Sequence, residues 1–78
     1  MVVYEFVMEV TEPYAIPYCM FRQLFKDRDE AVEYMHRKMQ ERPHLTWGQA
    51  APNDDCWFEA EDSEQAYYEA RVIPLDVI

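Results

Sequence analysis

The sequence predicts a single α+β domain over residues 1–78, with one helix packed on one face of a four-stranded antiparallel sheet. An alternating apolar pattern opens the chain, an amphipathic helical pattern occupies its middle, and two further extended segments follow. The order of elements along the chain is therefore β-β-α-β-β. A chain of 78 residues has room for one hydrophobic core.

The first expected strand runs from Val2 to Thr11, where apolar and polar side chains alternate. This period of two is typical of a strand with one buried face. The side chains expected to share one face are Tyr4, Phe6, Met8 and Val10. Pro13 and Pro17 interrupt the pattern, so we expect a connection near residues 12–17 and a second strand from Tyr18 to Phe25.

A helix is expected from Arg28 to about Arg42. Asp27 and Glu30 have the spacing of a capping box, in which Asp27 accepts a backbone N–H and Glu30 reaches back to the cap. Apolar residues recur at i, i+4 and i+8 as Ala31, Met35 and Met39. Pro43 ends the helical pattern, because the residue before a proline disfavours the helical conformation.

Two more strands are expected at Cys56 to Glu61 and at Ala66 to Leu75, joined by a polar turn. Residues 43–54 are expected to form a loop. From this loop, Leu45 and Trp47 should fold back over one end of the core. The last two strands therefore form a hairpin, the simplest way to add them to an antiparallel sheet.

The net charge limits the classes of partner. Sixteen acidic residues outnumber seven basic ones, for a formal charge of −9 at pH 7. Nucleic acids and anionic membranes bind mainly through lysine and arginine, so neither is expected as a partner. No apolar run reaches the roughly 18 residues of a membrane span, and the N-terminal segment lacks the basic start of a signal peptide. We expect a cytoplasmic protein.

One helix covers one face of a sheet, so the other face meets water or a partner. Burial of Phe58 and Ala60 turns the neighbouring carboxylates outward; the opposite parity would bury Glu59 or Glu69 at a cost of several kcal/mol. The expected partner-binding residues on the uncovered face are Glu5, Glu9, Trp57, Glu59, Glu61, Tyr67 and Glu69. Arg71 falls on the same face.

This face has the character of a binding surface for a basic protein. Carboxylates at i and i+2 of a strand lie roughly 6.6 Å apart, similar to successive phosphates of a nucleic acid. Aromatic side chains of the kind set among them often dominate binding energies. The sequence therefore suggests an inhibitor that mimics DNA toward a nucleic-acid-binding protein. In size and acidity the chain resembles small phage and mobile-element inhibitors of the anti-restriction and anti-CRISPR types, although it shares no motif with them.

Two readings of the same face compete with this one. Acidic side chains can simply keep a small protein soluble, without any partner. Val3 and Val7 share the outward parity of the first strand, so a second copy of the chain could bury them in a homodimer.

An enzyme is not expected, and neither are a metal ion, a cofactor or catalytic residues. Cys56 could act as a nucleophile with His44 as its base, but a cysteine in a strand is more often a small buried hydrophobe. Cys19 and Cys56 do not form the framework of a secreted disulfide protein. The two cysteines and two histidines lack the paired spacing of a zinc site. Residues 53–55 lack the rest of a calcium loop.

Overall fold

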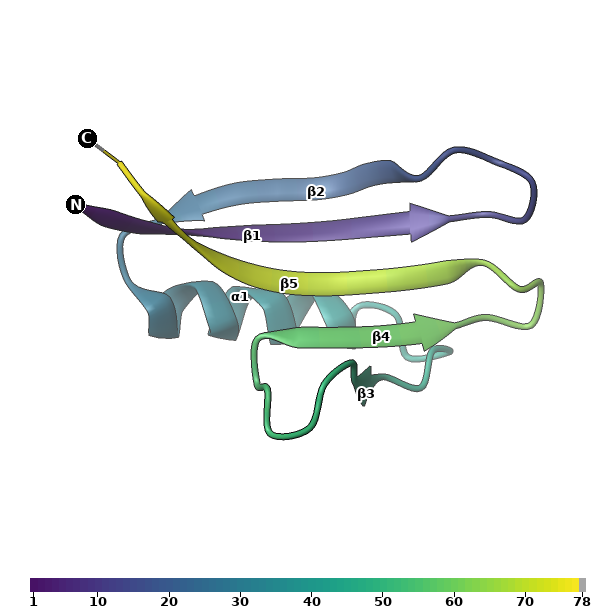
Figure 1. The fold of residues 1–78 in the computed structure, drawn as a ribbon. Coiled ribbons are helices and arrows are strands. Elements are labelled where there is room, and N and C mark those ends of the chain that lie inside the picture. The colour runs from purple at the N-terminus through teal and green to yellow at the C-terminus, as the bar shows by residue number, and fades with distance from the viewer. Residues whose placement is uncertain (78) are drawn as a thin grey trace.

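Five strands and one helix lie within residues 1–77, the part of the chain that the computed structural model describes (Figure 1). They are β1 (Val2–Thr11), β2 (Tyr18–Phe25), α1 (Arg28–Gln40), β3 (Gly48–Gln49), β4 (Trp57–Glu61) and β5 (Tyr67–Asp76). The strands form one antiparallel sheet in the order β2-β1-β5-β4-β3. The predicted α+β class, with an antiparallel sheet and one helix, is confirmed.

The predicted number of four strands is wrong, because β3 adds a fifth inside the segment expected to be a loop. Gly48 pairs with Glu59 and Gln49 with Phe58, and the Ala50 N–H donates to the Trp57 carbonyl over 3.0 Å. Two residues are too short to show a period-two pattern. The pairing with β4 creates this strand, and no local sequence signal marks it.

The two longest strands, β1 and β5, lie side by side at the centre of the sheet. Their register runs from Val2 opposite Asp76 to Thr11 opposite Tyr67. The two hairpin connections, β1 to β2 and β4 to β5, therefore lie at the same end of the sheet, and the termini lie at the other end (Figure 1). The molecule is elongated, with a longest extent of 40 Å.

Helix α1 begins as its capping residue predicts. The Asp27 carboxylate accepts the Asp29 backbone N–H over 3.0 Å. Within residues 1–77 no hydrogen bond joins Glu30 to the cap, so the second half of the expected capping box does not form. The helix ends at Gln40, slightly before the expected Arg42, because the chain tightens there: the Arg42 N–H donates to the Met39 carbonyl, three residues back.

The hydrophobic core lies between α1 and the strands β1 and β5. The buried side chains that form it are Phe6, Met8, Ala31, Met35, Met39, Ala70 and Val72. Phe6 also meets the Tyr34 ring edge to face, with 5.4 Å between centroids. Leu45 is buried and Trp47 packs against the core from the loop after the helix, as the sequence suggested.

The tip of the β1–β2 hairpin contains an unusual backbone conformation. The Ala15 N–H donates to the Glu12 carbonyl over 3.1 Å, which closes a turn with Pro13 and Tyr14 at its centre. Tyr14 has a φ of 61°, a left-handed conformation that suits glycine or asparagine. Its side chain is fully exposed.

Replacing Tyr14 with glycine should therefore stabilise the fold. Relief of the left-handed strain is worth roughly 1–2 kcal/mol, and the extra freedom of glycine in the unfolded chain costs roughly 0.5–1 kcal/mol. We expect a net gain of about 0.5–1 kcal/mol in the free energy of unfolding by urea. Tyr14→Ala keeps the strain and is the control. A loss of stability in the glycine variant would contradict this account of the turn.

Candidate functional site

The sheet face opposite α1, called the open face below, carries all seven residues that the sequence singled out. Core residues Phe6, Met8, Ala70 and Val72 fix the parity, because alternate residues of β1 and β5 then point away from the helix. Within residues 1–77 no helix or strand forms a second layer on this face (Figure 1). On the open face lie Glu5, Glu9, Trp57, Glu59, Glu61, Tyr67 and Glu69.

Three glutamates stand next to one another across the middle strands. Glu9 on β1 is the register partner of Glu69 on β5, and Glu69 is the register partner of Glu59 on β4. Adjacent strands lie about 4.8 Å apart, so this glutamate row (Glu9, Glu69, Glu59) concentrates three negative charges on one line. Like charges directly opposite each other destabilise a sheet.

Each carboxylate of the glutamate row accepts one hydrogen bond from a side chain of a neighbouring row. Arg71 donates to Glu9 over 2.6 Å, the Trp57 indole N–H to Glu69 over 2.8 Å, and the Tyr67 hydroxyl to Glu59 over 2.5 Å. These bonds fix the orientation of all three carboxylates. Only one of the three donors carries a positive charge, so the row keeps a net negative charge.

The remaining two predicted residues differ in their surroundings. Glu5 lies 3.4 Å from Arg22 on β2 and is largely buried, whereas Glu61 is exposed at the hairpin end. Val7 is only 2 % exposed although it lies on the open face, because its register partners Arg22 and Arg71 flank it. The parity predicted for these residues agrees with the structure, whereas the ion pairs, which depend on strand register, were not predicted. The expectation that a second copy could bury Val7 is wrong, because the chain itself already buries this side chain.

The open face changes character along its length. Its hairpin end is acidic and aromatic, whereas its terminal end is apolar. The apolar side chains there are Val3, Leu24, Ile73 and Leu75, with Leu24 and Leu75 exposed. A surface that served only to keep the protein soluble would not need separate apolar and acidic regions.

The pKa of Tyr67 is raised above its usual value of about 10, first by burial and then by its hydrogen bond to Glu59 and the nearby charge of Glu69. The folded state therefore holds this proton more tightly than the unfolded chain. Above pH 10 the unfolded state ionises first, so stability present below pH 10 is lost as pH rises.

Replacing Tyr67 with phenylalanine should flatten this loss. The difference in slope between wild type and Tyr67→Phe is expected to be at most about 1.4 kcal/mol per pH unit above pH 10, measured by urea unfolding between pH 8 and pH 11. Tyr14→Phe changes an exposed tyrosine and is the control. Parallel pH curves for wild type and Tyr67→Phe would show that the proton is not held by the fold.

The cysteine alternative receives no support from the surroundings of Cys56. Its thiol contacts Arg28 at 3.1 Å and Asp55 at 3.5 Å, and neither hydrogen-bonding neighbour is an imidazole. Burial, followed by the hydrogen bond to Asp55, raises the pKa of the thiol. The Arg28 guanidinium acts in the opposite direction and lowers the pKa, so the raised pKa is the net result of these effects. Cysteine nucleophiles more often have a lowered pKa.

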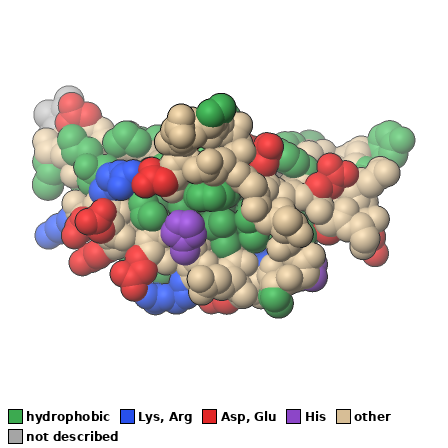
Figure 2. Space-filling view, turned by 90° about the horizontal axis from the view of Figure 1, so that it is seen from below, with side chains coloured by type: hydrophobic (Ala, Val, Ile, Leu, Met, Phe, Trp, Pro, Cys, Tyr) green, Lys and Arg blue, Asp and Glu red, His purple; other side chains and the backbone are tan. Residues whose placement is uncertain are grey.

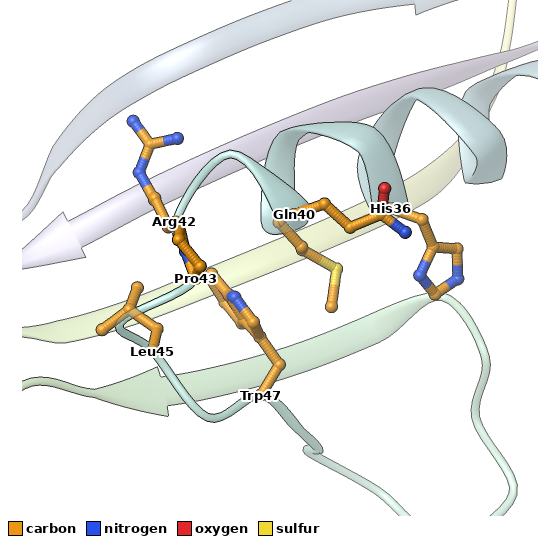
Figure 3. A pocket seen from close by; sticks show the side chains of 7 residues that line it. His36, Gln40, Arg42, Pro43, Leu45 and Trp47 are labelled. Carbon is orange, nitrogen blue, oxygen red and sulfur yellow. The ribbon is translucent and has the colours of Figure 1, made fainter.

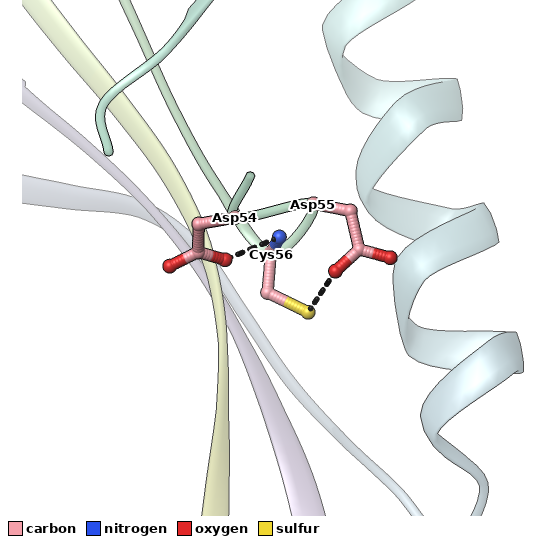
Figure 4. A group of neighbouring side chains, drawn as sticks. All are labelled: Asp54, Asp55 and Cys56. Carbon is pink, nitrogen blue, oxygen red and sulfur yellow. Dashed lines mark hydrogen bonds between the residues drawn. The ribbon is translucent and has the colours of Figure 1, made fainter. Parts of the chain in front are cut away.

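Asp54, Asp55 and Cys56 bring three potential metal-ligand atoms within 4.8 Å of one another (Figure 4). Each ligand atom already has a partner in the chain. Asp54 accepts the Cys56 backbone N–H over 2.8 Å, and the Arg28 guanidinium lies 2.7 Å from Asp55. A guanidinium at this position supplies the positive charge that a metal would supply, so the group is better described as an ion-pair cluster.

A hollow of about 300 Å³ opens on the helix side of the molecule, away from the open face. His36 and Gln40 of α1 border it, and Leu45 and Trp47 of the following loop close its other side (Figure 3). Seen from below, hydrophobic side chains gather in the middle of this side of the molecule (Figure 2). The His36 ring lies 5.3 Å from the Phe58 ring, edge to face, at the margin of the core.

Comparison of the chain with protein-family models, curated proteins and solved structures gives no significant match. Within residues 1–77, α1 is too short and too polar to cross a bilayer. The case for a function therefore depends on the surfaces themselves.

Proposed function

We propose that the chain is a protein-binding module whose open face binds a basic protein surface. The observation that carries this proposal is the glutamate row, in which three adjacent carboxylates are held in place by Arg71, Trp57 and Tyr67. Carboxylates that are already oriented lose little conformational freedom on binding. They therefore present a rigid negative surface to lysine and arginine side chains.

The energetics of the row favour a cationic partner. Its three like charges repel one another in the free protein, and one arginine compensates only part of that repulsion. Lysines or arginines of a partner would relieve it, while complementary potentials would also speed association. Solubility alone requires neither oriented carboxylates nor the half-buried Trp57 in the row beside them.

The finer proposal is that the partner is a nucleic-acid-binding protein and that the chain inhibits it as a DNA mimic. Carboxylates recur about 4.8 Å apart across the strands and roughly 6.6 Å apart along them. These spacings are of the same order as the distances between phosphate charges in a nucleic acid. A groove built for phosphates would then take the acidic end of the open face.

The test removes charge from the row without changing its shape. We expect the variant E9Q/E59Q/E69Q to lose binding to a basic partner by at least about ten-fold, because each glutamine still accepts a hydrogen bond but attracts no cation. The control variant E30Q/E33Q/E41Q removes three exposed carboxylates from the helix and its C-terminal end, away from the open face. Binding is compared by pulldown from lysate, with double-stranded DNA added as competitor.

Wild type and control should retain the same basic proteins, which DNA should displace. Equal retention by the row variant would disprove a role for the glutamate row. Retention that depends on the row but resists DNA would support the basic partner and disprove the DNA-mimic step.

Self-association is the second candidate, and the apolar terminal end of the open face is the observation that favours it. Leu24 and Leu75 are exposed there, and within residues 1–77 β2, which carries Leu24, is an edge strand of the sheet. Light scattering after size-exclusion chromatography would give twice the chain mass of 9.4 kDa for a dimer. Leu24→Ser should restore the monomer mass if this end is the contact.

A further inference from the structure

The tip of the β1–β2 hairpin is an exposed, uncharged segment in a strongly acidic chain. Residues 13–21 contain no charged side chain, although the chain as a whole carries −9. The hairpin tip, defined here as residues 13–18, exposes Tyr14 fully, Ile16 by 87 % and Tyr18 by 53 %. Exposed apolar groups clustered in this way are typical of contact sites.

The backbone of the hairpin tip is restricted before any partner arrives. Pro13 and Pro17 each fix one backbone angle, and the bond from the Ala15 N–H to the Glu12 carbonyl closes the turn between them. A segment held in this way loses little conformational freedom on binding. It is suited to insertion into a pocket of fixed shape.

Tyr14 is the residue that stability does not explain. It occupies the turn position that favours glycine, at a φ of 61°, and its side chain is fully exposed to solvent. Strained residues that serve no internal packing are found where function requires them. The ring of Tyr14 lies fully in solvent and is therefore available for a contact outside the chain.

Three acidic side chains lie beside the base of the hairpin tip, on the side of the β4–β5 turn. Glu12, Asp62 and Glu64 line a shallow hollow there together with Pro13. Backbone N–H groups, first that of Ala66 and then that of Glu64, lower the pKa of Asp62 and keep it ionised. The apolar tip therefore projects beside a group of three carboxylates (Glu12, Asp62 and Glu64), and both hairpin connections lie at this end of the sheet (Figure 1).

We propose that the hairpin tip inserts Tyr14 and Ile16 into an apolar pocket bordered by basic side chains, on the same protein that the open face binds. This inference rests on the proposed function, which supplies the basic partner, and it adds that the partner has an apolar pocket. The three carboxylates beside the base of the tip would meet basic side chains on the rim of the pocket, while Tyr14 and Ile16 fill the pocket. Tyrosine anchors of this kind often dominate interface energies.

The same three carboxylates argue against two other occupants. An anionic membrane would repel them. In a symmetric dimer through the tips, the two groups of carboxylates would approach each other with the same sign of charge.

The first measurement locates the contact. A photo-crosslinking benzoylphenylalanine is placed at position 14, or at position 33 on the far side of α1 as control, in cells that make the protein. The expected result is an adduct from position 14 alone, on a basic protein, at an apolar peptide flanked by lysine or arginine. No adduct, equal adducts from both positions, or an adduct to a second copy would overturn the proposal.

The second measurement separates the hairpin tip from the open face. The partner captured by the crosslink is purified, and its binding to each variant is measured by isothermal titration. We expect Y14A/I16A to bind this partner at least ten-fold more weakly than wild type does. The fold of the variant is checked by circular dichroism. If Y14A/I16A binds as tightly as wild type while E9Q/E59Q/E69Q does not, the tip proposal is wrong and the open-face proposal stands. If E9Q/E59Q/E69Q binds as tightly as wild type while Y14A/I16A does not, the open-face proposal is wrong and the contact through the tip stands. If wild type binds phosphatidylcholine vesicles and Y14A/I16A does not, the tip contacts lipid, and the proposal of a protein pocket is wrong.

Discussion

Replacing Phe6 with alanine is expected to remove a large part of the free energy of unfolding. Phe6 is fully buried at the centre of β1, against α1 and the Tyr34 ring. Truncation of a buried phenylalanine costs about 3–5 kcal/mol. A domain of this length has a total stability of roughly 4–12 kcal/mol, from about 0.05–0.15 kcal/mol per residue. The loss therefore takes a large share of the whole.

Urea unfolding followed by circular dichroism measures this effect. Phe6→Leu keeps most of the buried volume and should lose less than half as much stability. Leu24→Ala, on an exposed position of β2, should change the free energy of unfolding by less than about 0.5 kcal/mol. A small loss for Phe6→Ala would mean that the core does not centre on β1.

The strong local patterns of the sequence predicted most of the fold. The bounds of β1 and β2 follow from alternation and from the prolines between them, and Asp27 marks the start of α1. The strand Gly48–Gln49 escaped prediction because its only cause is pairing with β4. Elements that exist through tertiary contacts leave no periodic trace in the chain.

The sequence predicted on which face of the sheet the candidate site residues lie, but not which of them lie opposite one another on neighbouring strands. Burial of Phe58 and Ala60 was enough to direct Glu59 outward, since successive strand residues point to opposite faces. The alignment of Glu9 with Glu69 depends on the register between two strands distant in sequence. Composition and alternation contain no information on that register, so the glutamate row emerged only from the structure.

The exposed hairpin tip illustrates the same limit. The prolines at positions 13 and 17 indicated a connection, and the structure adds the left-handed conformation of Tyr14 within it. A tyrosine in that position runs against the usual turn preferences. A residue that breaks a local rule in this way is a candidate for a functional role, and sequence patterns alone did not identify it.

Replacing Arg71 with methionine should expose how much the glutamate row depends on its one cation. Methionine keeps an unbranched apolar stem beside Val7 and removes the charge that pairs with Glu9. Both partners are about a third exposed, which places the pair between a surface ion pair and a buried one. We expect a loss of about 2 kcal/mol in the free energy of unfolding.

Two controls separate charge from packing in this prediction. Because the freed carboxylates repel one another through partly exposed space, the loss should shrink when salt is raised from 0.05 to 1 M. In a Glu9→Gln background the same Arg71→Met change should cost less, by about 1 kcal/mol, since one of the repelling charges and the ion pair are already gone. Strictly additive losses, unaffected by salt, would mean that Arg71 acts only by covering Val7 and that the three carboxylates do not interact.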